Sequence, residues 1–358
     1  MPLILVDMAE PPDRVVKVPD ATSTNALDAG GLTPRQVRFL MTVMLHSGVF
    51  VGRQYAAFAG ITHGQKVHNF IKTLLARRFV TPLALGTTGR ARIFHVHHKP
   101  LYAAIGEQDN RLRRRVTIER AVERLMVLDG VLADGTVTWL GAERDKRRYF
   151  QARFGNRLRD DEYPRLVFGR AHNVTVRYFP DKLPIGYDAD RYQHVFLYLA
   201  RSPSPADFRV FLLRHQELLN ALDFWTIRVL FPRSLARFMD GFERAAHETL
   251  ARPLTPDTVT ELLWLFEHSR SDGPAVPAVD PVRLQAARTA FRRPRFTALR
   301  RRWLEDGARS VFVATSPVAR DALERGRGRV ECVELPHNYD YLRALGRLRP
   351  PRDGREGG

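Results

Sequence analysis

The sequence predicts a mixed α/β protein with two folded regions. A short first region, residues 32–106, shows helical periodicity three times and then two strand-like segments. A longer second region, residues 111–345, alternates strand and helix patterns, which is typical of a sheet covered by helices. The chain of 358 residues is too long for one ordinary core, and its hydrophobic content of 44% is typical of a folded protein.

The first region opens with a clear helix-start signal. Thr33 can cap the helix, Pro34 occupies the first turn, and Gln36 completes a capping box. Apolar residues then recur at helical spacing until Ser47-Gly48. A helix beginning at Thr33-Pro34 is therefore expected.

Two further helices and a β-hairpin follow in this region. The second helix is expected over 52–59, and the third begins at Thr62. Strands are expected over 80–85 and 92–97, joined by the glycine-rich tip 86–90. Three helices followed by a hairpin predict a winged helix-turn-helix over 32–106.

The charge distribution supports a polyanionic partner. The net charge is +18, and residues 32–106 hold ten basic side chains and no Asp or Glu. Residues 1–31 carry two basic and five acidic side chains, and they are expected to form a flexible arm. A folded stretch without any carboxylate repels itself unless a polyanion lies against it, and nucleic acid is the commonest one.

The outer face of the third helix carries long and amide-bearing side chains, which match the hydrogen-bonding groups on base edges in the major groove. Arginines beside the glycines of the hairpin tip can reach a phosphate or the minor groove. The residues expected to contact DNA are Gln65, Lys66, Asn69, Lys72, Thr73, Arg77, Arg90 and Arg92. The alternative is a winged helix that docks proteins and whose polar residues are merely solvated.

The second region begins with an amphipathic helix over 111–130. Strands are expected over 136–140, 174–179, 183–186, 194–200, 226–231, 310–315 and 330–335. Helices are expected over 205–222, 234–251, 257–267 and 317–325, so that 234–305 forms a helical insertion. Residues 346–358 are expected to form a flexible tail.

Pro180-Asp181 precedes an apolar strand, and the order of helix, three strands, helix and strand resembles the PD-(D/E)XK nuclease-like fold. In that family the Pro-Asp dyad supplies a metal ligand and the next strand supplies further acids. Here the strand 194–200 contains no acid. Metal-assisted hydrolysis needs several hard oxygen ligands, so Asp188 and Asp190 would have to fold back over Asp181. The second region is therefore expected to be either a degenerate nuclease-like scaffold or an unrelated α/β domain, and no catalytic residue is assigned.

The winged helix, the helix that follows it and the Pro180-Asp181 strands together resemble the replication-relaxation family of bacterial mobile elements. The resemblance covers residues 32–232 and rests on element order. Members of that family pair an N-terminal winged helix with a nuclease-like α/β domain. The resemblance implies a regulatory or DNA-processing role on a plasmid or integrated element, without catalysis.

Three other patterns carry competing interpretations. His95, His97 and His98 suggest a metal site or a hairpin strand that tolerates histidine near phosphates, and no metal or cofactor is assigned. The arginines of 283–302, interleaved with Phe291, Phe296 and Trp303, form either a second phosphate-tracking surface or solvated helices with core aromatics. The single cysteine, Cys332, excludes an internal disulfide and is interpreted as a small core residue.

The function expected from these patterns is sequence-specific binding of duplex DNA, as a transcriptional regulator or DNA-processing accessory factor. The alternative is a replication initiator or metal-dependent nuclease that acts through the α/β domain. The chain lacks an 18-residue apolar run and the basic start of a signal peptide. A cytoplasmic, nucleoid-associated protein without a membrane partner is therefore expected, and a homodimer is left open.

Overall fold

The computed structural model describes residues 31–84, 92–169, 174–269 and 280–345. The chain is of the mixed α/β class and forms two compact units. The first unit runs to Gly135 and also takes in the segment from Glu334 onward, while the second unit holds Thr136–Val333. The second unit is thus inserted between two parts of the first. The predicted arm 1–31, except its last residue, and the predicted tail 346–358 lie outside the described residues.

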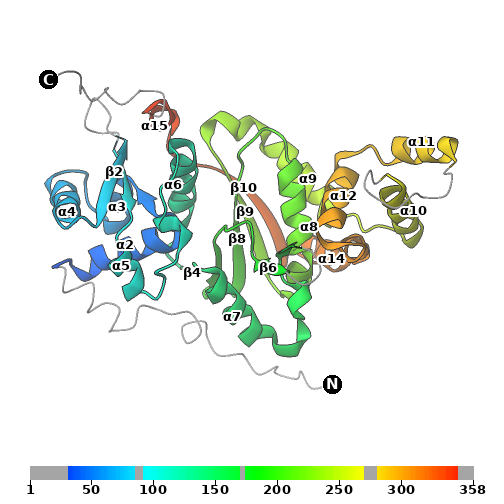
Figure 1. The fold of residues 1–358 in the computed structure, drawn as a ribbon, viewed down its shortest axis with the longest axis horizontal. Coiled ribbons are helices and arrows are strands. Elements are labelled where there is room, and N and C mark those ends of the chain that lie inside the picture. The colour runs from blue at the N-terminus through cyan, green and yellow to red at the C-terminus, as the bar shows by residue number, and fades with distance from the viewer. Residues whose placement is uncertain (1–30, 85–91, 170–173, 270–279, 346–358) are drawn as a thin grey trace. The chain divides into compact units, whose positions relative to one another are not determined.

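The first unit consists of short helices around a three-stranded antiparallel sheet of order β1-β3-β2 (Figure 1). Its elements are α2 (Pro34–His46), β1 (Val49–Phe50), α3 (Gly52–Ala59), α4 (Gln65–Ala76), β2 (Val80–Ala84), β3 (Ile93–Val96), α5 (Lys99–Ala104), the 3-10 helix η2 (Arg111–Arg113), α6 (Ile118–Leu132) and α15 (Asp340–Leu345). The predicted strands match β2 and β3, whereas β1 was not predicted.

The predicted capping box is present at the start of α2. The backbone N–H of Thr33 donates to Gln36 Oε1 at 2.8 Å, and the N–H of Gln36 donates to Thr33 Oγ1 at 3.4 Å. The third helix, α4, begins at Gln65 rather than at Thr62, with Gly64 as its N-cap. Thr62 is of a residue type common at helix N-caps and so predicted the helix start, whereas Gly64 has no side chain that could signal the true N-cap.

Aromatic side chains form the core of the first unit. The ring of Phe39 lies against those of Phe50, Tyr55 and Phe70, with centroids 5.2–6.1 Å apart. The side chain of Leu128 from α6 belongs to the same core. The helix predicted over 111–130 begins at Ile118 and packs in the first unit, so the predicted domain boundary near residue 110 differs from the observed one. An amphipathic pattern shows that a helix face is buried but not which domain buries it.

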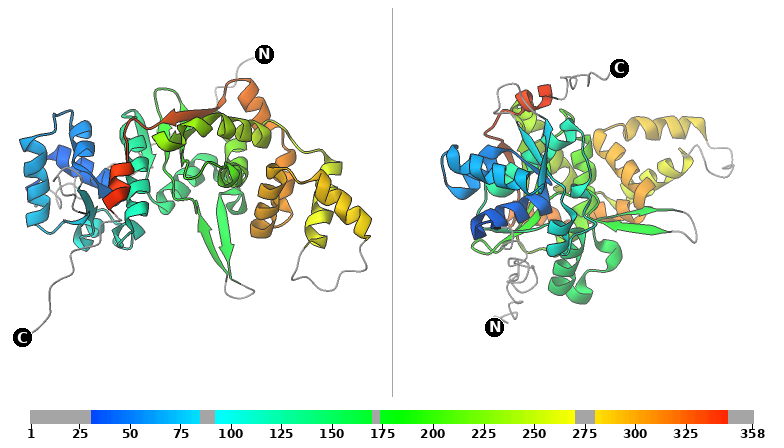
Figure 2. Two further views of the ribbon diagram at one scale, coloured as in Figure 1. Left: turned by 90° about the horizontal axis from the view of Figure 1, so that it is seen from above. Right: turned by 60° about the vertical axis from the view of Figure 1, so that its left-hand side comes forward.

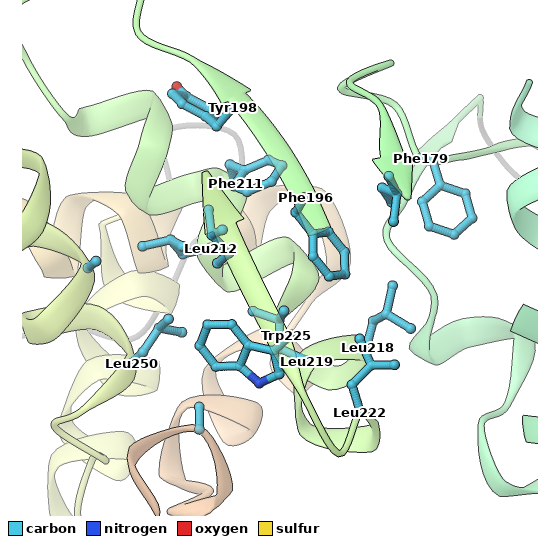
Figure 3. Packing of buried hydrophobic residues seen from close by; sticks show 14 of the residues in the cluster. Phe179, Phe196, Tyr198, Phe211, Leu212, Leu218, Leu219, Leu222, Trp225 and Leu250 are labelled. Atoms are coloured by element: carbon cyan, nitrogen blue, oxygen red, sulfur yellow. The ribbon is translucent and has the colours of Figure 1, made fainter. Parts of the chain in front are cut away.

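The second unit is built on a five-stranded sheet of order β10-β9-β8-β7-β4. Its strands are β4 (Val137–Leu140), β7 (Ile185–Asp188), β8 (Gln193–Leu199), β9 (Trp225–Phe231) and β10 (Gly328–Glu334). β4, β7 and β8 run antiparallel in sequence, and β9 pairs in parallel with β8 after the crossover helix α8 (Ala206–Ala221). Large side chains from β8, α8 and β9 fill the core of this unit (Figure 3).

Helices surround this sheet and extend beyond it. They are α7 (Glu143–Phe154), η3 (Gly155–Arg157), η4 (Asp160–Glu162), η5 (Arg233–Phe238), α9 (Met239–Leu250), α10 (Pro256–His268), α11 (Pro281–Ala290), α12 (Pro294–Asp306), α13 (Arg309–Phe312), η6 (Val313–Thr315) and α14 (Val318–Glu324). The described part of the predicted insertion 234–305 is helical, and α7 was not predicted.

One strand prediction in the second unit was wrong, and one predicted strand is present but lies in a separate two-stranded sheet. Residues 310–315 form α13 and η6, because Val311 and Ala314 are buried three positions apart while Phe312 is 55% exposed, which is a helical rather than an alternating pattern. The strand predicted over 174–179 is β6 (Thr175–Tyr178), which pairs only with β5 (Arg165–Phe168) and stands out from the main sheet (Figure 2). Its alternating pattern fits any strand and does not identify the partner strand.

Two buried histidines predict how the second unit responds to acid. Burial lowers the pKa of His194 to about 3 and that of His215 to about 4. Both pKa values lie below 6.5, the pKa of a histidine in the unfolded chain. As pH falls below 6.5, the unfolded chain therefore binds protons that the folded chain does not bind. The stability that the two neutral imidazoles give to the folded state is lost over this range. The free energy of unfolding should drop by about 2 kcal/mol per histidine between pH 7 and pH 5.

The measurement is urea unfolding followed by tryptophan fluorescence, since all four tryptophans lie in the second unit. The variant His194→Gln/His215→Gln should show a flatter dependence on pH over the same range. Equal unfolding midpoints at pH 7 and pH 5 for the natural chain would contradict the assignment of neutral buried imidazoles.

Candidate nucleic-acid interface

Helix α4 presents the residues expected to read DNA. Gln65, Asn69 and Lys72 lie four and three positions apart and are exposed, while Val67, Phe70 and Leu74 on the opposite side are buried. The amide Nε2 of Gln65 donates to Asn69 Oδ1 at 2.8 Å, which orients both amides along the helix. The structure therefore brings Gln65, Asn69 and Lys72 into one exposed row.

The other predicted α4 residues lie on one flank of that row. Lys66 is exposed, and Arg77 is exposed at the residue after the helix. Thr73 is only half-buried, and its hydroxyl donates to the backbone oxygen of Asn69 at 3.0 Å. In the described part of the chain no ion pair involves Lys66, Lys72, Arg77 or Arg92. These cations are thus available to a ligand, whereas the Thr73 hydroxyl already has an acceptor.

A groove of about 490 Å³ runs beside α4. Its floor is apolar and is made by Val67, Ile71 and Leu75 of α4 together with Phe94 of β3. Its polar lining consists of His63, His68, Lys72 and Arg92. Arg92, predicted from the hairpin, therefore lies at the same groove as Lys72, while Arg90 lies outside the described residues.

His63 and His68 were missed by the sequence reasoning. His68 is exposed and lies four positions before Lys72, so helical spacing alone places both on one side of α4. His63 is exposed in the turn before α4, and its Cε1 atom lies 2.8 Å from the position that a Cβ atom on Gly52 would take. A side chain at position 52 would displace this imidazole from the groove.

The acid-free stretch belongs to a unit that does contain acids. Arg53 donates to both carboxylate oxygens of Asp129 in α6, at 2.9 and 2.7 Å, and Arg35 donates to the backbone oxygen of Ala59 at 3.0 Å. Some of the ten basic residues therefore hold the fold together. The electrostatic case rests on the exposed cations around α4, and not on the whole stretch.

The three histidines of β3 and its end have separate environments. His95 is buried, its Nε2 lies 3.0 Å from the backbone oxygen of Leu112, and burial lowers its pKa. The His97 ring lies 6.1 Å from that of His95, whereas His98 packs against Phe79. Among the described residues no group of three or more His, Cys, Asp or Glu side chains is arranged to hold a metal ion.

Asp181, the candidate nuclease carboxylate, lies in a network of ion pairs. Arg214 of α8 donates to Asp181 Oδ1 at 2.6 Å and to Glu305 Oε2 of α12 at 2.9 Å. A guanidinium thus bridges the two carboxylates. Asp188 accepts from the N–H groups of Asp190 and Arg191 and so closes its own turn at the end of β7.

Lys146 and Cys332 of the second unit lie against its sheet, the first buried and the second partly buried. Lys146 is buried, burial lowers its pKa to about 8, and its Nζ donates to the backbone oxygen of Leu183 at 2.7 Å. Cys332 packs against the sheet core, and burial raises its pKa to about 12. A thiol with that pKa is protonated at neutral pH, which agrees with a packing role.

The aromatics of the arginine-rich segment are part of a core. Phe291 and Phe296 are partly buried and pack edge to face at 5.0 Å, and Trp303 is buried beside Phe266. Their rings are therefore not a stacking surface for bases.

Comparison with known proteins gives no family model, no curated protein and no solved structure that matches this chain. Within the described residues no helix is long and apolar enough to cross a membrane.

Proposed function

We propose that this chain binds duplex DNA in a sequence-specific manner, with α4 as the reading helix. The observation that carries the proposal is the exposed row of Gln65, Asn69 and Lys72, which has buried apolar residues behind it. Cations on both sides of the row have no ion pair among the residues that the structure describes. A helix with an amide-bearing and basic outer face fits the major groove, whose base edges pair with Asn, Gln, Lys and Arg.

The surroundings of α4 support this role. Helix, strand, two helices and two strands follow in the order that winged helices have, and the β2–β3 hairpin lies beside α4 through the groove lined by Lys72 and Arg92. In such an arrangement the second helix of the helix-turn-helix reads bases and the hairpin contacts the adjacent backbone. We assign base contacts to Gln65, Lys66 and Asn69, and phosphate contacts to Lys72, Arg77 and Arg92.

The wider role that we propose follows the resemblance to the replication-relaxation family. It is that of a regulator or DNA-processing accessory factor of a bacterial mobile element, located in the cytoplasm with the nucleoid. The second unit would then serve as a docking or dimerising platform. A replication initiator would use the same α4 surface and would differ in the DNA site that it recognises.

The first prediction concerns salt. Each phosphate contacted by a cation releases counterions, so the logarithm of the association constant should fall linearly with the logarithm of the salt concentration. With the three phosphate contacts assigned to Lys72, Arg77 and Arg92, affinity for a duplex should fall about fortyfold from 50 to 200 mM salt. Fluorescence anisotropy with a labelled duplex measures this, and an affinity that is flat across the range contradicts the electrostatic part of the proposal.

The second prediction concerns readout. Asn69→Ala and Lys66→Ala should each reduce discrimination between a selected site and a scrambled duplex by about 1–3 kcal/mol, because a base contact is lost. Arg92→Ala should weaken both duplexes alike. Arg38→Ala, an exposed arginine of α2, is the control and should change neither. Equal losses from Asn69, Lys66 and Arg92 on both duplexes would show that α4 does not read the sequence.

The third prediction concerns catalysis, and we propose that the second unit is not a nuclease. The Arg214 guanidinium pairs with Asp181, the one carboxylate that the nuclease resemblance makes a metal ligand, and also with Glu305. Purified protein should therefore leave supercoiled plasmid intact with added Mg²⁺ or Mn²⁺. Metal-stimulated cleavage that Asp181→Ala abolishes would overturn this proposal and favour the alternative of an enzyme.

A further inference from the structure

Arginines gather where α11 meets α12 in the second unit. Arg288 lies in the last turn of α11, Arg292 and Arg293 form the connection, and Arg295 lies in the first turn of α12. Arg295 also donates to the backbone oxygen of Arg252, and the charge of Arg252 lies near enough to lower the pKa of Arg295. These five residues are called the α11–α12 cluster, and all of them except Arg295 are exposed.

The cluster differs from its neighbours in having no bound carboxylates. On the same two helices Arg283 pairs with Glu261 at 3.0 Å, and Arg301 pairs with Asp207 at 2.7 Å. In the described part of the chain no ion pair involves a member of the cluster. Burial and the nearby charges of Arg209 and Arg252 lower the pKa of Arg295 to about 10, against the opposing effect of the Glu248 carboxylate, which is itself paired with Arg209. The four exposed arginines of the cluster have no ion pair with a carboxylate in the described part of the chain.

The chemistry of the cluster selects one class of ligand. An arginine guanidinium can donate two parallel hydrogen bonds to one phosphate. Several guanidinium groups in a short segment therefore suit a ligand with repeated phosphates. A single-stranded nucleic acid would also need aromatic faces for its bases. The nearest rings, Phe291 and Phe296, pack into the core instead. The surface therefore offers charge without stacking, which suits the backbone of a duplex.

We propose that the α11–α12 cluster is a second, sequence-independent contact with the phosphate backbone of duplex DNA. The identity of the partner rests on the proposed function, but the contact itself does not depend on α4. Binding through the cluster adds affinity to every duplex equally, because phosphates carry no sequence information.

The test uses the full chain with Arg288→Gln/Arg292→Gln/Arg293→Gln, which removes three exposed charges and keeps polar side chains of similar length. Affinity should fall at least tenfold for the selected and the scrambled duplex alike at about 100 mM salt, and the salt slope should become shallower by about 0.9 per lost contact. The matched control is Arg283→Gln/Arg301→Gln on the same helices. Because both arginines are already paired, its affinity should stay within about twofold of that of the natural chain.

The possible results separate this proposal from the first. If the triple variant keeps its duplex affinity while Asn69→Ala shows the expected loss, the cluster does not bind DNA and α4 remains the reading helix. A uniform loss in the triple variant with no effect of Asn69→Ala supports the cluster and contradicts the reading helix. A loss confined to single-stranded DNA or RNA overturns the duplex as the ligand. A natural chain that binds no duplex overturns both proposals.

Discussion

The carboxylate of Asp129 joins two helices and the C-terminal segment of the first unit. It accepts two hydrogen bonds from Arg53, one from Gln54 at 2.9 Å and one from the hydroxyl of Tyr339. These donors come from α3 and from the returning C-terminal segment, and the acceptor comes from α6 (Figure 1). Only a short turn separates α3 from α4, so the position of α3 restricts the orientation of α4.

This contact also explains how the chain accommodates its second unit. The chain leaves the first unit after α6 and returns at Glu334, and the returning segment is bound to the helix after which the chain departed. Removal of Asp129 would leave the Arg53 guanidinium without its partner while it is three-quarters covered. Loss of one member of a buried ion pair costs about 3–5 kcal/mol, because the remaining charge is uncompensated.

Arginine has two distinct uses in this protein. In the second unit Arg214 and Arg302 are buried and share the Glu305 carboxylate, at 2.9 and 2.8 Å. The Arg214 pair fastens α8 to α12, whereas the Arg302 pair lies within α12. The basic side chains around α4 and those of the α11–α12 cluster other than Arg295 are exposed, and they hold no carboxylate in the described part of the chain. The first kind builds the fold, whereas the second leaves charge for a polyanion. Net charge alone does not distinguish them.

Local patterns predicted local structure well, and they failed where a partner had to be chosen. The Thr33–Gln36 capping box and the exposed face of α4 depend on neighbours within one helix, and both were predicted from spacing. The membership of α6 in the first unit depends on Asp129 meeting Arg53, which lies 76 residues away. Likewise, the pairing of β6 with β5 and the bridge from Arg214 to Glu305 have no signature in the neighbouring sequence.

The most direct test of the central claim is selection of bound duplexes from a random library by the full-length protein and by its Asn69→Ala and Arg92→Gln variants. If α4 reads DNA, the natural chain enriches one sequence motif. The Arg92→Gln variant then binds less DNA but enriches the same motif. The Asn69→Ala variant changes or loses the preference at one or two adjacent base pairs. An unenriched library, or an identical motif from Asn69→Ala, would contradict the assignment of α4 as the reading helix.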